Sequence, residues 1–482
     1  MRKLCPQSFK NIYHLGMAVL ANLFFGFPGR KIKVIGITGT NGKTTTVQMV
    51  ARVLEVGGSK VALASTINFR IGDKEWVNTT KMTTLSSFRV QSFLAQAVKE
   101  SCEYAILEVS SHSLDQNRVW GIPFEIAIIT NITREHLDYH ETMDKYRRAK
   151  KRLFKNVRVA VVNLDMKSPE YFLDCDARII YGYSTKNQKS KLKIQNDKSK
   201  LKTIQAKDIN LGLSGTNYKL QTTNYKINLP GLFNVENALA ATCVGLACGI
   251  SEDSIGEALG SIKLVPGRME KIPNILGIDI IVDYAVTPDS LEKLYSYISD
   301  SKREDAKVIA VFGSCGERDR GKRPIMGKIV SNRADLIIIT NEDPYGENPV
   351  DIINQVFSGV VGYEVKGTFP NFQFPRLPKT GTGGQAISNF QTPPKADQPM
   401  AEISELSNDQ ISNDKKVEGE NAWRILDRRV AIREALLLAK PGDTVVVTGK
   451  GAEETMAIGD ERIPWNDKNV ILEELEKIKK AP

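Results

Sequence analysis

The sequence predicts an α/β protein with two doubly wound units, each built on a mostly parallel sheet covered by helices. Two observations predict this fold class. Strand-like runs rich in β-branched residues alternate with helical segments from residue 32 onward, and a glycine-rich turn joins the first run to a helix. The alternation begins again after Pro266-Gly267, and a chain of 482 residues is too long for one ordinary core.

Residues 1–31 are expected to form a short N-terminal segment in which the apolar run Ile12–Phe27 is helical. The run is short for a membrane span and contains His14 and Asn22, so no stable span is expected. Packing of this helix on the first domain is the simpler interpretation. Peripheral contact with a membrane is the alternative.

The first domain is predicted to extend over residues 32–265. A stretch at about 185–208 interrupts it, since Lys186–Lys207 contains eight lysines and one acidic residue. It lacks aromatic residues for base stacking, so we interpret it as a solvated insertion and not as a nucleic-acid site. The expected strands are Lys33–Ile37, Tyr104–Val109, Ile126–Thr130 and Val157–Val162, and the expected helices are Thr44–Glu55, Phe88–Lys99, Met143–Phe154 and Asn234–Cys248.

The second domain is predicted over residues 266–482. Residues of roughly 366–420 are rich in Pro, Gly, Ser, Gln and Asn and cannot bury enough apolar surface to offset chain entropy, so a disordered insertion is expected there. The expected strands are Ile278–Val282, Val308–Val311, Leu336–Thr340 and Thr444–Thr448, and the expected helices are Ser290–Ile298, Arg323–Asn332 and Asp427–Ala439.

The composition narrows the function classes. The chain has 66 basic and 56 acidic residues, a net charge of +10 that suits an anionic small-molecule substrate. Its six cysteines are scattered without a CxxC pair, which disfavours a zinc ribbon and indicates a reducing, cytoplasmic compartment. We expect a monomer with small-molecule partners and no nucleic acid.

The strongest functional pattern is Ile32–Thr46, where an apolar strand ends in the turn GTNGKT and a helix-compatible segment follows. Backbone N–H groups in such a turn cradle phosphate, the lysine reaches the outer phosphates and the hydroxyl after it suits a magnesium ion. The spacing is shorter than the usual GxxxxGK[ST] motif, but strand, turn and helix fall where phosphate binding needs them. The predicted nucleotide contacts are Gly39, Thr40, Asn41, Gly42, Lys43, Thr44 and Thr45.

Glu108 directly follows another strand-like run, at the carboxyl end where ligands of open α/β sheets bind, and could hold a phosphate-bound magnesium. His136 and His140 are four residues apart, as some zinc ligands are, but the segment lacks the HExxH pattern. Structural histidines are the simpler interpretation of His112 and His140. By composition alone, Lys150 is an ordinary lysine on a basic helix.

Eight segments together resemble the Mur ligase family, and within it the enzymes that add the third amino acid of the peptidoglycan stem. They occur in order between residues 36 and 454: GITGTNGKTT, EVSSHSLDQNRV, TNITREHLDYH with YRRAK, LPGLFNVENALAA, VPGRME, DYAVTPDSLEK, GERDRGKRPIMG and GDTVVVTGKGAEE. The resemblance implies a P-loop central domain that binds ATP and a C-terminal Rossmann-like domain. It also implies that the family's N-terminal UDP-binding domain is largely missing here.

In this family ATP phosphorylates a carboxylate, and an amine then attacks the acyl phosphate to form an amide. The resemblance implies that Lys43, Glu108, His136 and a carbamylated Lys150 are catalytic, and that magnesium is held by Thr44, Glu108, His136 and Lys150. It assigns further ATP contacts to Asn237, Arg268 and Asp283. The implied substrate contacts are Thr83, Thr84, Ser110, Gln116 and Arg118 for the UDP-muramoyl dipeptide, and Arg318, Asp343, Tyr345, Gly449 and Glu453 for the amino acid.

Four departures from the family pattern affect these expectations. Only about 31 residues precede the first strand, which bears on how UDP is held. Val286 and Ala452 replace two histidines of the family. Tyr345 stands where diaminopimelate-adding members carry an arginine, which disfavours diaminopimelate.

The sequence therefore predicts an ATP- and Mg²⁺-dependent, ADP-forming amide ligase of peptidoglycan precursor synthesis that adds a diamino acid. One alternative keeps this chemistry but uses another acceptor, such as a folylpolyglutamate-like or lipid-linked one. The other is a non-catalytic nucleotide-binding partner.

Overall fold

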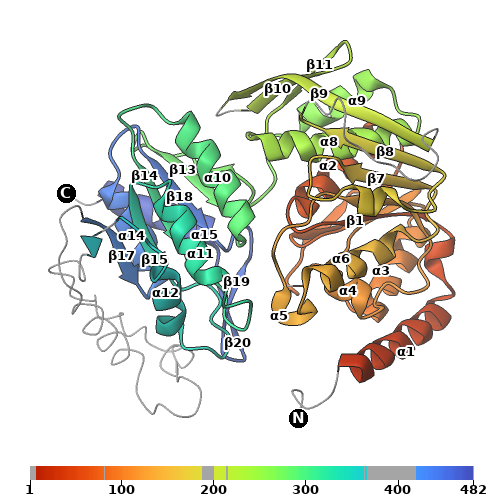
Figure 1. Cartoon of the computed structure of the whole chain (residues 1–482), viewed down its shortest axis with the longest axis horizontal. Coiled ribbons are helices and arrows are strands. Elements are labelled where there is room, and N and C mark those ends of the chain that lie inside the picture. The colour runs from red at the N-terminus through yellow and green to blue at the C-terminus, as the bar shows by residue number, and fades with distance from the viewer. Residues whose placement is uncertain are drawn as a thin grey trace. The chain divides into compact units, whose positions relative to one another are not determined.

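The computed structural model describes residues 7–80, 82–186, 200–212, 215–362, 364–365 and 420–480. The chain divides into two compact units, Met1–Val265 and Pro266–Pro482, each with one main sheet (Figure 1). The α/β fold class with mostly parallel sheets, predicted from the sequence, is confirmed in both units.

The first unit contains an 11-stranded sheet among its described residues, in the order β11-β10-β9-β8-β7-β6-β1-β5-β2-β3-β4. The seven strands from β9 to β2 in this order are parallel, and antiparallel hairpins extend the sheet at both edges. The strands are β1 (Lys33–Thr38), β2 (Val61–Ala64), β3 (Asn68–Ile71), β4 (Lys74–Val77), β5 (Tyr104–Glu108), β6 (Phe124–Ile129), β7 (Val159–Asn163), β8 (Ile179–Ser184), β9 (Leu201–Gly212), β10 (Gly215–Leu220) and β11 (Thr223–Ile227).

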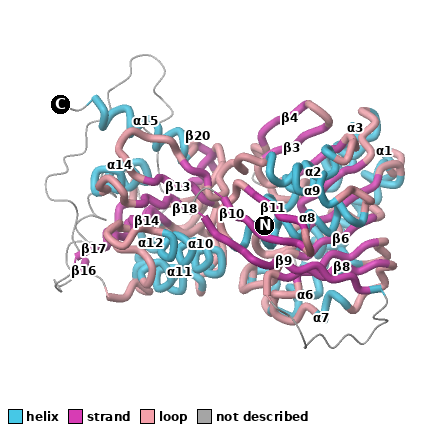
Figure 2. The backbone as a smooth tube through the Cα atoms, turned by 90° about the horizontal axis from the view of Figure 1, so that it is seen from above, coloured by secondary structure: helices cyan, strands magenta, loops and turns pink. Residues whose placement is uncertain are grey.

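Helices cover both faces of this sheet because its central strands are apolar on both sides (Figure 2). Ile35 and Ile37 of β1 join the core under α2 (Lys43–Val56), α8 (Leu232–Ala247) and α9 (Glu252–Ser261). Val34 joins the opposite core. That second face is covered by α3 (Ser87–Lys99), α4 (Ser111–Asp115), α6 (Met143–Lys151), η2 (Arg152–Phe154) and α7 (Glu170–Leu173).

The remaining elements of the first unit are α1 (Gln7–Phe25), η1 (Pro28–Arg30) and α5 (Leu137–His140). Helix α1 packs beside α3, as the simpler interpretation of the N-terminal segment expected. In the part of the chain that is described, no helix is both long and apolar enough to span a membrane.

The prediction of a solvated insertion at about 185–208 is partly wrong. Leu201–Gly212 is strand β9, which pairs in parallel with β8 and buries Ile204 and Ala206. The lysine-rich composition hid this strand, because the exposed Lys202 and Lys207 stand close to its two buried apolar side chains. Residues 187–199 of the expected insertion lie outside the described residues, as do residues 366–419 of the expected disordered insertion.

The second unit has a seven-stranded sheet among its described residues, in the order β12-β13-β18-β14-β15-β17-β16, parallel except at β12. Helices α14 and α15 share a core with one face of the sheet, and α10, α11 and α12 lie on the other (Figure 1). The strands are β12 (Glu270–Lys271), β13 (Asp279–Asp283), β14 (Val308–Phe312), β15 (Leu336–Thr340), β16 (Glu364–Val365), β17 (Glu420–Ile425) and β18 (Thr444–Thr448). The helices are α10 (Pro288–Ser301), α11 (Lys322–Ser331), α12 (Pro349–Phe357), α14 (Arg428–Leu438) and α15 (Asp467–Lys480), and the separate hairpin is β19 (Thr455–Ile458) with β20 (Glu461–Pro464).

A buried ion pair joins α14 to α15. The Arg428 guanidinium donates to both carboxylate oxygens of Asp467, at 2.8 and 2.6 Å, and Trp465 Nε1 donates to the same carboxylate at 2.8 Å. Asp467→Ala should therefore lower the free energy of unfolding of this unit by about 3–5 kcal/mol, because it leaves the guanidinium buried without its carboxylate. Urea unfolding measures the loss. As a control, Glu292→Ala removes a part-exposed pair with Arg333 and should cost less than about 1 kcal/mol; equal losses would contradict the prediction.

Candidate active site

The sheet order of the first unit brings three loops together. Strand β1 lies between β5 and β6 and is parallel to both, so the loops that follow these strands meet at one edge of the sheet. The turn GTNGKT follows β1 and the TNIT segment follows β6, while Glu108 is the last residue of β5.

The turn after β1 is held tightly against the loop after β6. Asn131 accepts from the Thr40 and Asn41 N–H groups through its carbonyl oxygen and Oδ1, at 3.0 and 2.9 Å. A Cβ on Gly39 would lie 1.8 Å from Thr130 Oγ1, so no side chain fits there. Gly42 has φ 82°, a conformation that favours glycine, and caps the N-terminus of α2.

Lys43 and Thr44 open α2 from this turn. Lys43 Nζ donates to the Thr40 carbonyl at 2.9 Å, and Thr44 Oγ1 donates to Glu108 Oε2 at 3.0 Å. The same Glu108 oxygen accepts from the N–H of Thr66 at 2.8 Å. A hydroxyl and a carboxylate oxygen at the N-terminus of a helix form a donor set that fits Mg²⁺.

Lys150 is buried at the same turn. Its Nζ donates to the Gly39 carbonyl at 2.7 Å and lies 4.7 Å from the centroid of the Tyr146 ring, and the Tyr146 hydroxyl is 3.1 Å from Thr40 Oγ1. Burial, and then the charge of Lys43, lower the pKa of Lys150 well below its ordinary value. The interpretation of Lys150 as an ordinary lysine on a basic helix is therefore wrong, because its side chain is buried, and that burial shifts its amine toward the neutral form.

His136 lies in the left-handed region, with φ 57°, immediately before α5. Its ring centroid is 4.7 Å from that of His112 and 6.2 Å from that of Tyr146, which links it to the surroundings of Lys150. His140 is buried with Nε2 2.9 Å from Ser111 Oγ, and burial is the main cause that lowers the pKa of His140 to about 4. His140 is therefore a neutral structural histidine. Among the described residues there is no cluster of three His, Cys, Asp or Glu side chains able to hold a metal.

The predicted acceptor contacts gather at the end of β5. Thr84 Oγ1 donates to the Glu108 carbonyl at 3.0 Å and accepts from the Ser110 N–H at 2.9 Å. Arg118 donates to the Thr84 carbonyl at 3.4 Å and to the side-chain oxygen of Gln116. Thr83, the remaining predicted contact, is 3.3 Å from Thr66 Oγ1 through its own hydroxyl.

Asn237 lies in α8, and its side chain faces the phosphate turn. Asn237 Oδ1 accepts from Thr46 Oγ1 at 3.2 Å and would be 2.4 Å from a Cβ placed on Gly42. Its Nδ2 donates to Asn234 Oδ1 at 3.2 Å. The residue predicted to contact ATP from α8 is thus beside the turn predicted to hold its phosphates.

In the second unit, Arg268 and Asp283 lie close to the end of β13. Asp283 Oδ2 accepts from the Met269 N–H at 2.7 Å, and burial raises the pKa of Asp283 while Arg268 opposes this shift. The Arg268 guanidinium lies 4.5 Å from the centroid of the Tyr284 ring. At Val286, where the family has a histidine, the backbone carbonyl accepts from Lys322 Nζ at 2.9 Å.

Lys450, to which the sequence assigned no role, lies among the residues predicted to contact the amino acid. Its buried Nζ donates to both oxygens of Asp343 at 2.8 and 2.9 Å and to Glu453 at 2.5 Å. Although burial alone lowers it, Glu453 and Asp343 raise the pKa of Lys450, so the ammonium stays charged. The segment TGKGAEE was the available signal, but only the fold shows that its lysine meets Asp343.

Tyr345 is fixed by the β19–β20 hairpin. Its N–H donates to the Ala457 carbonyl at 3.3 Å, and its carbonyl accepts from the Gly459 N–H at 2.7 Å. The guanidinium carbons of Arg318 and Arg462 lie 5.4 and 6.0 Å from the centroid of the Tyr345 ring. Two arginines thus flank this tyrosine, which stands where some family members have an arginine.

Gly449 lies directly after β18, beside the end of β15. A Cβ on this residue would be 2.6 Å from Glu342 Oε2, and its φ of 113° favours glycine. The second unit therefore brings together Asp343, Tyr345, Gly449, Glu453 and Arg318, the residues predicted to contact the amino acid, around loops that follow β14, β15 and β18.

Comparison with known proteins identifies the family. Residues 37–245 match the Mur ligase middle domain, and residues 267–370 match the Mur ligase, glutamate ligase domain. The chain is 35% identical to UDP-N-acetylmuramoyl-L-alanyl-D-glutamate--2,6-diaminopimelate ligase 1 of Clostridium acetobutylicum over 96% of the chain and 82% of that relative. It is 33% identical to UDP-N-acetylmuramyl-tripeptide synthetase of Roseiflexus sp. over 94% of the chain and 80% of that relative.

Solved structures agree with this match. A UDP-N-acetylmuramoyl-L-alanyl-D-glutamate--2,6-diaminopimelate ligase structure superposes with a TM-score of 0.55 at 27% identity, covering 93% of this chain and 79% of that one. Folylpolyglutamate synthase of Mycobacterium tuberculosis shares the fold, with a TM-score of 0.62 at 15% identity over 91% of this chain and 92% of that one. On its sequence matches, its fold and the residues of its phosphate turn, this chain belongs to the Mur ligase family.

Proposed function

We propose that this chain is an ATP-dependent, ADP-forming ligase that adds an amino acid to UDP-N-acetylmuramoyl-L-alanyl-D-glutamate in peptidoglycan precursor synthesis. The observation that carries the proposal is the meeting of Lys43, Thr44 and Glu108 with the buried amine of Lys150 at one turn. The names of the curated relatives support this acceptor. Because the reaction consumes ATP, we place it in the cytoplasm.

In this proposal, the N–H groups of the turn and Lys43 bind the phosphates of ATP. Thr44, Glu108, His136 and Lys150 would hold magnesium, which when bound offsets the repulsion between the acceptor carboxylate and the γ-phosphate. Thr83, Thr84, Ser110, Gln116 and Arg118 would position the acceptor beside this edge of the sheet.

Lys150 suits carbamylation for a physical reason. Only a neutral amine can react with carbon dioxide, and burial beside Lys43 favours the neutral form of Lys150. The carbamate would carry a negative charge next to Lys43 and the N-terminus of α2. Lys43 and the N-terminus of α2 would attract this negative charge, whereas they repel a protonated amine.

The second unit is proposed to bind the rest of ATP through Arg268 and Asp283, and the incoming amino acid through Arg318 and Glu453. Tyr345 alone would disfavour diaminopimelate, because it stands where other family members have an arginine for the distal carboxylate. The Arg462 guanidinium, with its carbon 6.0 Å from the centroid of the Tyr345 ring, would replace that lost cation from another part of the chain. Of the diamino acids, we therefore propose one that carries a distal carboxylate.

The first test is the ligase reaction itself, followed as ADP release with the muramoyl dipeptide and a panel of amino acids. Lys150→Ala should lower kcat by about 100-fold or more, with partial rescue by a small added carboxylate, because a metal ligand is lost. Lys151→Ala is the matched control, since Lys151 bonds to the Tyr171 and Asp174 carbonyls, and it should retain activity within about twofold. Unchanged activity in Lys150→Ala would remove the carbamate from the mechanism, and release only with a folate or lipid-linked acceptor would replace the proposed substrate.

The second test concerns the amino acid. Arg462→Gln should raise KM for meso-diaminopimelate by about tenfold or more and leave KM for lysine nearly unchanged, because one charge-assisted contact is lost. Arg333→Gln is the control, because Arg333 precedes the amino end of β15, whereas Tyr345 follows the carboxyl end of that strand. Steady-state kinetics with both amino acids measure the difference. Equal effects on both amino acids would show that Arg462 does not read a distal carboxylate.

A further inference from the structure

Helix α1 directs several polar side chains toward the protein and its large apolar side chains toward the outside. An ordinary surface helix turns its apolar face to the core and its polar face to water. Here polar side chains face the first unit: Gln7 Nε2 donates to the Tyr139 hydroxyl at 2.9 Å, and Asn22 Nδ2 donates to the Trp120 carbonyl at 2.9 Å. Asn11 Nδ2 also donates to Asp115, at 3.2 Å.

The opposite face of α1 is apolar and exposed. We call it the outer stripe, and its members recur every three to four residues over four turns of the helix. Gly16 continues the same line, with nothing within 4 Å of a Cβ placed on it. The large side chains of the outer stripe and their exposed fractions are Phe9 (64%), Ile12 (67%), Tyr13 (63%), Leu20 (56%), Leu23 (60%) and Phe24 (76%).

No element among the described residues covers this stripe. In Figure 1, α1 is the outermost element on its side of the first unit, with α3, α4 and α6 between it and the sheet. Ala18 and Ala21, on the inner side, are fully buried, so the helix is docked and not displaced. Exposing six large apolar side chains on one docked helix is unfavourable in water, which indicates that another apolar phase covers them.

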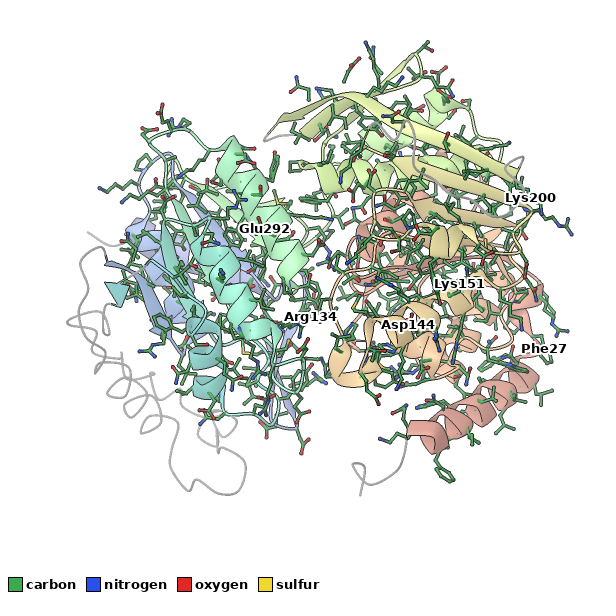
Figure 3. The ribbon with its side chains drawn as sticks, viewed as in Figure 1. Phe27, Arg134, Asp144, Lys151, Lys200 and Glu292 are labelled. Carbon is green, nitrogen blue, oxygen red and sulfur yellow. The ribbon has the colours of Figure 1, made fainter. Side chains whose placement is uncertain are left out.

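The charged residues next to the outer stripe are basic, which favours binding to an anionic surface. Helix α1 itself contains no acidic residue. Lys10 lies within α1, and Arg30 and Lys31 lie at the end of η1, the short helix that comes next in the chain. The Arg30 guanidinium is 4.5 Å from the centroid of the Phe27 ring. Phe27, which is labelled in Figure 3, lies just after the C-terminal end of α1.

Aromatic residues mark the same side. Phe24, Phe25 and Phe88 form a cluster with ring centroids 4.9 to 6.4 Å apart, and the side chain of Trp120 is 42% exposed where its carbonyl meets Asn22. Aromatic rings combined with flanking lysine and arginine are typical of helices that lie in a membrane interface. Lysine, in contrast, is depleted from protein–protein interfaces, so Lys10 and Lys31 favour a lipid surface over a protein partner.

We propose that α1 binds the first unit to the surface of an anionic lipid bilayer, with the outer stripe in the acyl-chain boundary and Lys10, Arg30 and Lys31 at the headgroups. The helix lies on the bilayer and does not cross it, because its other face is packed on the protein and hydrogen-bonded to it through Gln7, Asn11 and Asn22. This binding needs no nucleotide or substrate, so it stands apart from the ligase reaction.

The test is sedimentation of the full chain with vesicles of phosphatidylglycerol and phosphatidylcholine. The wild-type chain should bind, more weakly at high salt and more weakly to phosphatidylcholine alone. The double variant Leu20→Ser with Phe24→Ser should reduce partitioning by about tenfold or more, since both side chains leave the acyl boundary. Its circular dichroism should match the wild type because neither side chain is buried.

The matched control is Trp76→Ser with Leu437→Ser, which removes two exposed apolar side chains away from α1 and should leave vesicle binding unchanged. The proposal is overturned if the wild-type chain stays in the supernatant or if the α1 variant binds as well as the wild type. It is also overturned if sedimentation velocity without lipid shows a dimer that the α1 variant dissociates, since the outer stripe would then be an interface between two copies. Retained ADP release in the α1 variant would show that the ligase proposal is unaffected.

Discussion

The site of the first unit depends on one steric constraint. The backbone of Gly39 lies so close to the Thr130 side chain that no Cβ fits between them. Only a residue without a side chain allows β1 and β6 to bring their loops so close. This approach lets Asn131 bond the turn on one side, and it leaves the Gly39 carbonyl facing Lys150 on the other. The hydrogen bond from Thr44 to Glu108 then connects the turn to β5, so three strand ends share one site.

The two units treat buried lysines in opposite ways. Lys150 has no described carboxylate at hydrogen-bond distance, and its amine is driven toward the neutral form. Lys450 is as deeply buried, but Asp343 and Glu453 keep it charged. The difference follows from what each lysine meets at the end of its sheet. A neutral amine is chemically reactive, whereas a paired ammonium is a structural cation.

Local pattern was enough to predict most of the elements that carry the site. Strand β1, the turn GTNGKT and helix α2 follow from apolar alternation and glycine, and Glu108 was found because it ends a strand. Strand β9 was missed because its lysines outweigh the two buried side chains that define it. The burial of Lys150 and the pairing of Lys450 depend on contacts across 111 and 107 residues of sequence, which no local pattern reports. The reversed polarity of α1 was equally hidden, since its apolar composition suits burial as well as exposure.

The Lys450 pairing has a consequence for what can enter the second unit. Asp343 and Glu453 already share an internal cation, so a stray amine or metal ion arriving there gains little from their negative charge. A ligand must instead displace or reorganise that resident partner, and only one that also engages other groups can offset the cost. The Lys450 ammonium thus weakens the binding of nonspecific cations. A cationic ligand binds there only if it competes successfully with Lys450 for the two carboxylates.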